Sequence, residues 1–181
     1  MAGSGFAFYV GKGAKLERAL INFFLETHID GGYTELMPPF LVNRNAMIGT
    51  GQLPKMQEDM YHCADDDLFL IPTAEVPLTN FYQNEILNID KLPVRVCGYS
   101  PCFRREAGSY GKDTHGFLRV HQFNKVELVN ISVPEKSSEM LDLMLISVES
   151  ILQKLNLPHR ILLLCSGDTS FCSSKTFDFE V

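Results

Sequence analysis

The sequence predicts an α+β fold. Two stretches, residues 15–30 and 140–155, carry apolar side chains at the spacing of an amphipathic helix. Two others, residues 94–104 and 119–129, alternate side-chain character with a period of two, which is typical of strands. The chain has 181 residues, 45% of them hydrophobic and 21% charged, which suits one globular domain with a real core.

The N-terminal part predicts a short strand, a long helix and a second strand. Apolar side chains alternate over residues 6–10, and residues 15–30 then follow a helical period. Two glycines at 31–32 end the helix in the way that helix C-termini favour. Residues 33–37 predict a strand that is stopped by the two prolines at 38–39. The apolar stripe of the predicted helix consists of Leu16, Ala19, Leu20, Phe23 and Phe24.

The next part predicts loops around one short strand. Residues 41–61 are polar and contain turn-forming glycines and a proline, so they predict a surface loop. Three adjacent aspartates at 65–67 cannot all converge on one ion, so a solvated turn is expected there rather than a metal site. Residues 68–72 predict a buried strand. Thr73 would cap the helix that follows, with Glu75 in its first turn, where the helix dipole favours a carboxylate.

The last part predicts a helix followed by two strands. Ser132 and Glu135 have the spacing of a capping box, and helical spacing of apolar side chains then holds over residues 140–155. Residues 160–166 predict a buried strand because they form a short apolar run. A turn follows, and residues 176–181 alternate again as a strand would.

Residues 102–129 carry the most informative pattern, CFRREAGSYGKDTHGFLRVHQFNKVELV. They predict two strands joined by a long polar loop. One face of the second strand mixes charged, imidazole and aromatic side chains, as the floor of a binding site would. Arg104 and Glu106 share a face of the first strand by the same alternation. A solvated hairpin with weak cross-strand ion pairs fits the spacing equally well. The mixed face consists of Arg119, His121, Phe123, Lys125 and Glu127.

The net charge of −6 is distributed unevenly along the chain. Residues 104–127 carry five cations and three anions, a net charge of +2, so the rest of the chain carries −8. Attraction of phosphate groups is therefore expected to be local. This pattern permits contact with ATP or with an RNA end, but it does not indicate broad binding to a nucleic-acid duplex.

The cysteine pattern and the chain ends bear on the compartment. Five cysteines, an odd number without a CxxC pair, argue against a disulfide framework and a zinc ribbon and for a reducing environment. The N-terminus lacks the pattern of a signal peptide, and the longest aliphatic run is far too short to span a bilayer. We therefore expect a cytoplasmic protein.

Three motifs resemble class II aminoacyl-tRNA synthetases, in the form found in seryl-tRNA synthetases. FRREAGSYGKDTHGFLRVHQFNKVE, at 103–127, resembles motif 2 of that class. IPTAE, at 71–75, resembles the serine-site motif, and GTGQLP, at 49–54, also fits. The resemblance extends over almost the whole chain. It implies a partial catalytic domain over residues 3–181, with a mainly antiparallel sheet that is flanked by helices and truncated at the C-terminus.

The resemblance also implies an activity and partners. Seryl-tRNA synthetases are ligases that activate L-serine with ATP to seryl-adenylate and transfer the serine to tRNA(Ser). Motif 2 would extend over about residues 99–129. The long helix, glycine pair and strand at about residues 14–39 resemble motif 1, which builds a homodimer interface in the class. Any helix followed by an edge strand fits this last pattern equally well.

Individual residues receive roles from the same resemblance. Thr73, Ala74 and Glu75 would hold the α-amino group of L-serine, and Glu127 would receive its hydroxyl group. Arg104 would clamp the α-phosphate of ATP and the serine carboxylate, because a guanidinium fork suits planar oxyanions. The catalytic set would be Arg104, Glu106 and Glu127.

The ATP site would be completed by residues around the adenine ring. Glu106 would accept a hydrogen bond from the adenine amino group, Phe123 would stack on the ring, and Val120 would offer backbone contacts. Further ATP contacts would come from Arg105 and Arg119, and Lys125 would add a phosphate or acceptor-end contact. In the loop at residues 107–117, the tRNA acceptor end would meet Lys112 and His115, although the composition of this loop suits an idle surface loop equally well.

Several parts of the family are not found in this sequence. Members begin with a helical-hairpin arm that grips tRNA, and they continue into a Glu-x-Ser-Ser segment that helps to hold Mg²⁺ and ATP, and then into motif 3. We therefore expect no metal site within these 181 residues, most Mg²⁺ ligands to lie elsewhere, and serine activation by these residues alone to be poor or absent.

Two other functions stay open at this point. One is a non-catalytic dimerisation or binding module. The other is an amino-acid:carrier-protein ligase, but zinc-dependent ligases of that kind use cysteine and histidine where this chain has Thr73, Ala74 and Glu75.

Overall fold

The computed structural model describes residues 2–106 and 119–181. These residues form two compact units, residues 1–133 and 134–181, which are described in turn. The single domain expected from the chain length stays a prediction. Helices and mainly antiparallel strands confirm the predicted α+β class. None of the helices in the described residues has both the length and the apolar character needed to cross a bilayer.

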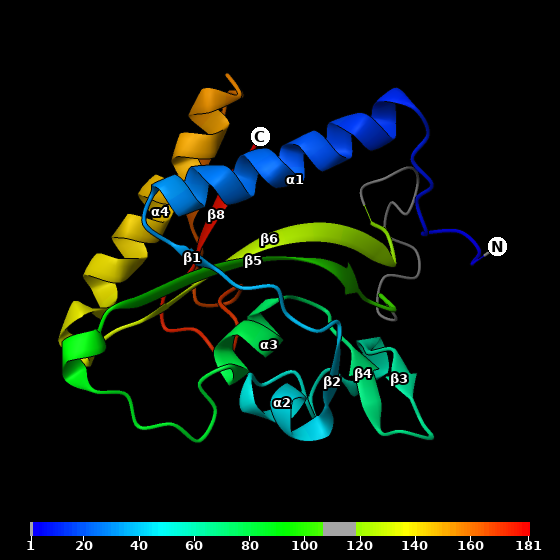
Figure 1. Cartoon of the computed structure of the whole chain (residues 1–181), viewed down its shortest axis with the longest axis horizontal. Helices are drawn as coiled ribbons and strands as arrows, with labels where there is room; N and C mark the ends of the chain where they lie inside the picture. Colours follow the sequence, from blue (N-terminus) through cyan, green and yellow to red (C-terminus); the bar gives the residue numbers. More distant parts are fainter. Residues whose placement is uncertain (1, 107–118) are drawn as a thin grey trace. The chain divides into compact units, whose positions relative to one another are not determined.

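The first unit is built around a three-stranded sheet of order β1–β5–β6 (Figure 1). β5 (Val94–Phe103) pairs with β6 (Gln122–Ile131) in antiparallel register along its whole length. β1 (Thr34–Glu35) joins the other edge of β5 in parallel. The two long predicted strands are therefore confirmed, although β6 begins at Gln122 and not at Arg119.

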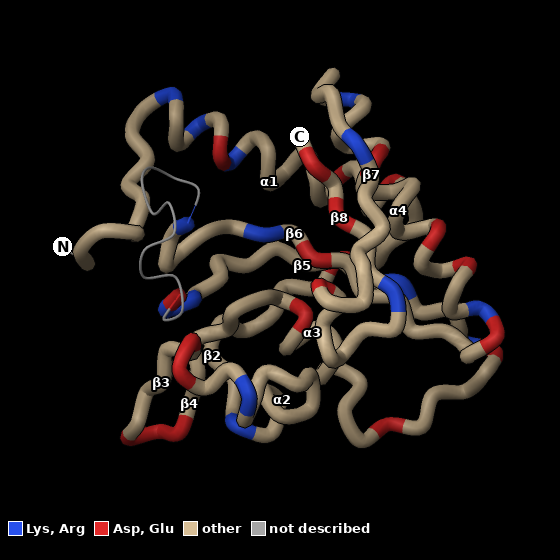
Figure 2. Tube along the Cα trace, turned by 180° about the vertical axis from the view of Figure 1, so that it is seen from behind, with Lys and Arg blue, Asp and Glu red and all other residues tan. Residues whose placement is uncertain are grey.

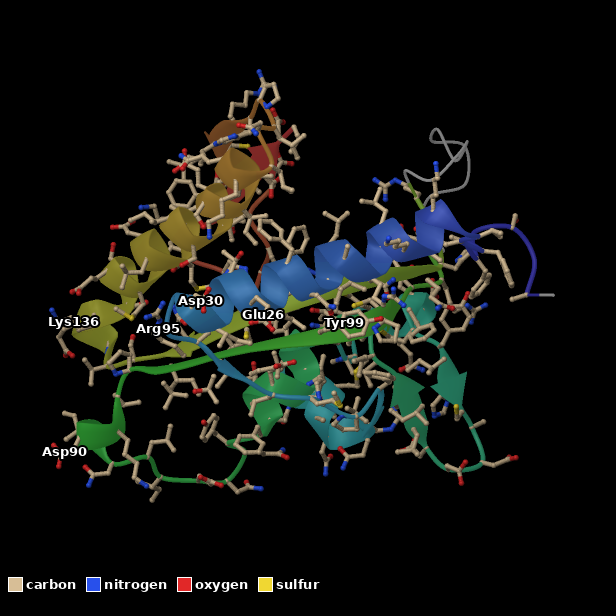
Figure 3. The ribbon with its side chains drawn as sticks, turned by 45° about the horizontal axis from the view of Figure 1, so that its top comes forward. Glu26, Asp30, Asp90, Arg95, Tyr99 and Lys136 are labelled. Atoms are coloured by element: carbon tan, nitrogen blue, oxygen red, sulfur yellow. The ribbon has the colours of Figure 1, made fainter. Side chains whose placement is uncertain are left out.

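Helices cover both faces of this sheet. α1 (Lys12–Asp30) crosses one face of β5 and β6, and α3 (Glu75–Asn80) lies against the other face (Figure 1). Arg95 of β5 holds the end of α1, because its Nη2 atom donates to the carbonyl oxygen of Gly31 at 3.0 Å. Its guanidinium also lies over the Tyr33 ring, and Figure 3 shows it close to the C-terminal end of α1.

The apolar stripe predicted for α1 is confirmed in part, because Leu20, Phe23 and Phe24 are half-buried. Leu16, at the start of that stripe, is 61% exposed. The helix also turns Glu17, Ile21 and Leu25 toward a cavity beside the sheet, and His28 is its buried residue. A stripe chosen from apolar residues alone cannot find this face, because a carboxylate and an imidazole belong to it.

The short strand predicted for residues 6–10 is also wrong. Phe6 makes one isolated parallel bridge to Gln122, while Phe8 and Val10 are 76% and 74% exposed. The alternation in the sequence has no partner strand among the described residues, and without paired backbone groups it does not produce a strand.

Residues 41–61 are not the surface loop that their polarity predicted. They form β2 (Leu41–Asn43), α2 (Arg44–Gly49) and the 3-10 helix η1 (Gln57–Asp59). Asn43 caps α2 by accepting a hydrogen bond from the amide of Ala46. Apolar residues scattered through this segment build a core cluster with the following strand: Val42, Ala46, Met47, Leu53, Met60, Phe69, Ile71 and Val76.

A second small sheet, of order β2–β4–β3, completes this part of the unit. β3 (His62–Cys63) and β2 flank β4 (Leu68–Leu70), whose Phe69 is 1% exposed, so the predicted buried strand is confirmed. The acidic turn between β3 and β4 is visible in Figure 2, and its Asp67 is paired with Arg44 and His62. No three His, Cys, Asp or Glu side chains of the described residues could hold a metal ion together.

The second unit contains α4 (Ser137–Lys154), which confirms the predicted helix. The capping box is wrong: the N-cap residue is Lys136, and Ser132 donates its hydroxyl to the carbonyl oxygen of Val133. The 3-10 turn η3 (Pro134–Lys136) lies between the expected cap and the helix and moves the helix start past it. In the first unit, a similar turn, η2 (Ile89–Lys91), leads into β5.

Two antiparallel strands follow α4, namely β7 (Arg160–Leu163) and β8 (Phe177–Glu180). The strand prediction is confirmed, but the predicted burial of the first strand is wrong. Ile161, Leu162 and Leu163 are 41%, 42% and 57% exposed. β8 is the strand that pairs with β7 within the described residues, so backbone pairing does not cover the other edge of β7.

Gly98 provides a test of how closely β1 approaches β5. A Cβ atom at Gly98 would lie 2.7 Å from the carbonyl oxygen of Leu36 and 3.1 Å from Leu78 Cδ2. We expect Gly98→Ala to lower the free energy of unfolding by about 1–3 kcal/mol in urea titrations, because overpacking forces neighbours apart. The control Gly13→Ala, inside α1, should raise it by about 0.5–1 kcal/mol. Unchanged stability of Gly98→Ala would contradict the close approach.

A hydrogen-bonded chain between α1 and the sheet provides a second test. Tyr99 Oη donates to Asn124 Oδ1 at 2.8 Å, and Asn124 Nδ2 donates to Glu17 Oε1 at 2.8 Å. Asn124→Ala would leave both partners unpaired, and we expect it to cost about 1–3 kcal/mol of unfolding free energy. Asn22→Ala, from the same side of α1, serves as control, and equal losses for the two variants would argue against this linkage.

Candidate functional site

One face of the β5–β6 hairpin gathers the side chains from which the site is built. The register places Phe123 opposite Cys102, Lys125 opposite Ser100 and Glu127 opposite Gly98. Directly opposed residues project from the same face of a sheet, so the predicted common face of Phe123, Lys125 and Glu127 is confirmed. Ser100 and Cys102, which project from the same face, are fully buried. Burial also raises the pKa of the Cys102 thiol, which favours its neutral form.

Thr73 connects this face to α3. Its hydroxyl donates to Glu127 Oε2 at 2.6 Å and accepts from Lys125 Nζ at 3.4 Å. Lys125 Nζ also lies 3.5 Å from the same Glu127 oxygen. Thr73 is 4% exposed, whereas Lys125 and Glu127 are partly open to solvent. A hydroxyl, an ammonium and a carboxylate therefore meet at one point.

The start of α3 places a second carboxylate near the first. The helix begins at Glu75, one residue later than predicted, and the amide of Glu75 donates to Thr73 Oγ1 at 3.2 Å. Burial raises the pKa of the Glu75 carboxyl, and the charge of Glu127 raises it further. The nearby cations Lys125 and Arg104 act in the opposite direction.

Arg104 lies at the end of β5 beside the aromatic residue of the face. Its Nε atom donates to the carbonyl oxygen of Pro72 at 3.3 Å, and its guanidinium carbon lies 5.2 Å from the centroid of the Phe123 ring. A cation over an aromatic face is attracted by the ring quadrupole. The predicted site residues that come together here are Thr73, Ala74, Glu75, Arg104, Phe123, Lys125 and Glu127.

Glu106 does not follow the alternation that predicted a common face with Arg104. β5 ends at Phe103, and Glu106 has a φ of 50°, in the left-handed region that few non-glycine residues adopt. Its carboxylate is paired with Arg119, whose Nη1 lies 3.1 Å from Glu106 Oε2. Arg119 and Val120 precede β6, so strand alternation does not orient their side chains.

Arg105 and His121 line a different cavity, of about 570 Å³. His121 was expected on the same face as Phe123, but it precedes β6, which begins at Gln122, so this stays a prediction. Its ring stacks on Phe6, and its Nδ1 atom lies 3.0 Å from the carbonyl oxygen of Arg104. The lining residues of this cavity are Gln57, Met60, Tyr61, His62, Phe69, Arg105 and His121.

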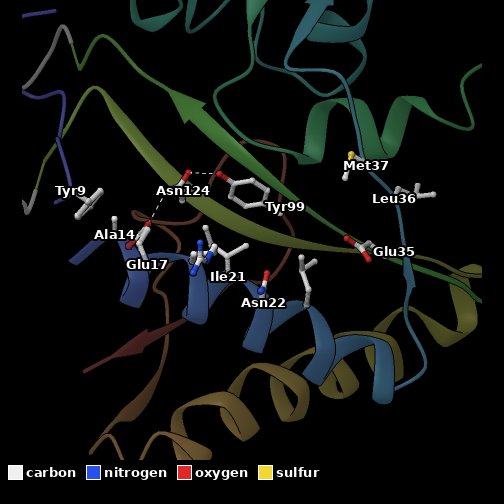
Figure 4. Close-up of a pocket in the computed structure, with 12 residues that line it drawn as sticks. Tyr9, Ala14, Glu17, Ile21, Asn22, Glu35, Leu36, Met37, Tyr99 and Asn124 are labelled. Carbon is white, nitrogen blue, oxygen red and sulfur yellow. Dashed lines mark hydrogen bonds between the residues drawn. The ribbon is translucent and has the colours of Figure 1, made fainter. Parts of the chain in front are cut away.

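The opposite face of the hairpin carries a second cavity, of about 520 Å³, shown in Figure 4. It lies between α1 and the sheet, and Tyr99, Asn124 and Glu17 follow one another along its wall (Figure 4). Its lining is mainly apolar, with Ile21 and Leu36 among the contributors. This cavity and the residues of the site face therefore lie on opposite faces of the same two strands.

The sequence did not identify every residue of this site, and two of the residues that it predicted are not described by the structure. Pro72, Ser100 and Cys102 were not assigned to the site, although the spacing of Ser100 and Cys102 on a strand was a usable signal. The predicted acceptor-end residues Lys112 and His115 lie outside the described residues.

The charges and hydrogen-bonding groups of these side chains indicate which kind of ligand the site could bind. Two carboxylates suit a ligand that carries an ammonium and a hydroxyl group, since both groups donate hydrogen bonds to carboxylate oxygens. Arg104 beside the Phe123 ring suits an oxyanion attached to a planar group. The part of the chain that the structure describes offers no equivalent cluster of metal ligands.

Comparison with curated proteins identifies close relatives. A serine–tRNA ligase of Chlorobium phaeobacteroides is 57% identical over 182 residues, which cover 100% of this chain and 42% of that protein. A serine–tRNA ligase of Heliobacterium modesticaldum is 56% identical and is covered to 43%. The chain thus spans less than half of the length of these relatives.

Solved structures and family models indicate the same family as the curated relatives. A crystal structure of seryl-tRNA synthetase from Pyrococcus horikoshii complexed with ATP matches with a TM-score of 0.95 and 42% identity, over 99% of this chain and 40% of that chain. The family model of the tRNA synthetase class II core domain (G, H, P, S and T) matches residues 60–181. That match includes more than half of the chain, which therefore belongs to the class II tRNA synthetase core-domain family.

Proposed function

We propose that this chain is the serine- and ATP-binding part of a serine–tRNA ligase. In this reaction ATP and L-serine form seryl-adenylate and pyrophosphate, and the serine is then transferred to tRNA(Ser). The observation that carries the proposal is the meeting of Thr73, Glu127 and Glu75 beside Arg104 and the Phe123 ring. The ATP complex of the solved relative from Pyrococcus horikoshii supports the nucleotide part.

The amino-acid part of the site would recognise L-serine through its two donors. Glu75 would accept from the ammonium group, with Thr73 and Ala74 beside it at the start of α3. Glu127 would accept from the serine hydroxyl. An amino acid without that hydroxyl would leave a desolvated carboxylate oxygen unpaired, which is the strongest basis for rejecting alanine.

The nucleotide part would hold the reacting phosphate and the base. Arg104 would bind the α-phosphate and the serine carboxylate, and Phe123 would stack on adenine. The pair formed by Glu106 and Arg119 would lie near the base and the outer phosphates, together with backbone contacts from Val120. Arg105 lines the separate cavity beside His121, so its predicted ATP contact has the least support from the geometry.

The chemistry requires positioning more than a protein nucleophile. A carboxylate oxygen of serine attacks the α-phosphorus, the bond to the bridging oxygen breaks, and pyrophosphate leaves with that oxygen. Arg104 would neutralise charge on the phosphate during this in-line displacement, and the carboxylates Glu75 and Glu127 would hold the attacking amino acid in line.

The implied Mg²⁺ ion does not fit the described residues as they stand. No three His, Cys, Asp or Glu side chains converge among them, so no step is derived through this ion. We also propose that residues 14–39 contribute to a homodimer, that Lys112 and His115 meet the tRNA acceptor end, and that the protein acts in the cytoplasm, where tRNA is charged.

Binding of a non-hydrolysable adenylate analogue tests the proposal without requiring turnover. Seryl-sulfamoyl-adenosine should bind the chain in isothermal titration calorimetry, and Arg104→Ala should weaken binding by about 10–100-fold, because a charged hydrogen bond is lost. Arg160→Ala, in the second unit, is the matched arginine control and should leave the Kd unchanged. Absence of binding to the unaltered chain would overturn the proposal.

The pH dependence of that binding tests the role of Glu75. The pKa of Glu75 is raised, and only the ionised carboxylate attracts an ammonium group, so affinity should fall as the pH is lowered through this raised pKa. Glu75→Gln should bind about ten-fold more weakly near neutral pH and should lose this part of the pH dependence. A pH profile that is the same in Glu75→Gln would exclude Glu75 as the ammonium acceptor.

A further inference from the structure

Lys125 occupies an unexpected place for a residue that the sequence assigned to phosphate or to the acceptor end. Its Nζ atom lies 3.4 Å from Thr73 Oγ1 and 3.5 Å from Glu127 Oε2. Thr73 is proposed to lie beside the α-amino group of serine, and Glu127 is proposed to receive its hydroxyl group. The ammonium is therefore directed at the amino-acid end of the site.

We propose that Lys125 is a positioning residue which, together with Thr73, fixes the carboxylate of Glu127 so that its second oxygen is presented to a substrate hydroxyl group. This inference rests on the proposed function, because the hydroxyl belongs to the proposed substrate. Lys125 itself would act through Glu127 and would not need to touch the ligand.

The hydrogen-bond directions at Thr73 support this role. A hydroxyl group has one proton to donate and two lone pairs to accept with. Two donors point at the Thr73 oxygen, namely Lys125 Nζ and the amide of Glu75. The hydroxyl proton is thereby directed to the remaining neighbour, Glu127 Oε2, at 2.6 Å.

The two oxygens of Glu127 are consequently unequal. Oε2 receives the Thr73 hydroxyl and lies closest to the Lys125 ammonium. Within the described part of the chain, no hydrogen bond or ion pair involves Oε1. A carboxylate held at one oxygen has a defined plane, so its other oxygen points in one direction and can select for a donor at that place.

The charges around the carboxylates explain why a cation is needed there. Glu75 approaches from α3 and Glu127 from β6, and the charge of Glu127 raises the pKa of the Glu75 carboxyl. The neighbours on β5 are the neutral Cys102 thiol and, beyond the strand end, Arg104, which lies over Phe123. Among the described residues, Lys125 makes the ion pair with Glu127.

The first test compares two adenylate analogues that differ by the hydroxyl. In calorimetry, Lys125→Met should weaken binding of seryl-sulfamoyl-adenosine by about 30-fold and of alanyl-sulfamoyl-adenosine by less than about three-fold. Lys125→Arg should restore most of the seryl affinity, because it keeps the cation. The exposed Lys136, paired with Glu139 in the second unit, provides the control variant Lys136→Met.

Equal losses for both analogues in Lys125→Met would overturn the inference, because a contact to the phosphate would affect both ligands alike. A lost seryl affinity that Lys125→Arg does not restore would also count against a role carried by the positive charge.

The second test requires no ligand and separates this inference from the proposed function. Carboxyl ¹³C NMR titration of Glu75, whose pKa is raised by burial and lowered by the charge of Lys125, should give a higher midpoint in Lys125→Met and an unchanged midpoint in Lys136→Met. If the unaltered chain binds neither analogue, the proposed function fails, and this titration still decides the role of Lys125: no shift would overturn it.

Discussion

The antiparallel register of β5 with β6 is the constraint on which the first unit depends. Ten residues of each strand face one another without interruption, from Val94 opposite Ile131 to Phe103 opposite Gln122. Since the side-chain period of a strand is two, this single register assigns every residue of β6 to one face or the other. Phe123, Lys125 and Glu127 reach one face, and the residues between them reach the opposite face.

This register also explains how a small site is assembled from distant segments. Thr73 and Glu75 come from the start of α3, whereas Glu127 lies 54 residues beyond Thr73 along the chain. α3 packs on the face where Glu127 projects, and the buried Ser100 and Cys102 support that face from β5. The polar groups of the site therefore lie beside buried, closely packed residues of β5.

Much of the fold was accessible from local patterns, and so was the strand that carries the site. The period of two placed Phe123, Lys125 and Glu127 together, and the family motifs pointed to Thr73 and Glu75. The pattern failed where β5 ends at Phe103: Glu106 was assigned by alternation beyond that end, where its backbone is in the left-handed region. A short stretch of sequence shows the alternation of side chains along a strand, but it does not show the residue at which the strand ends.

Other features depended on tertiary contacts that no local pattern contains. The buried face of α1 includes Glu17 because Asn124, 107 residues away, offers it a hydrogen bond. Residues 41–61 look like a loop because their apolar residues are scattered, yet Met47 and Leu53 are buried together in one cluster. The role inferred for Lys125 likewise requires distances to Thr73 and Glu127, since the sequence shows only a cation on a strand.

The contact of Asn124 with α1 has a mechanical consequence. Asn124 is flanked on β6 by Phe123 and Lys125, which project from the other face of the strand. A displacement of α1 that pulled on Glu17 would be transmitted through one hydrogen bond to the backbone of β6, and so to both neighbours. This hydrogen bond therefore joins α1 to the strand that carries the aromatic and cationic side chains of the site, from the opposite face of the sheet.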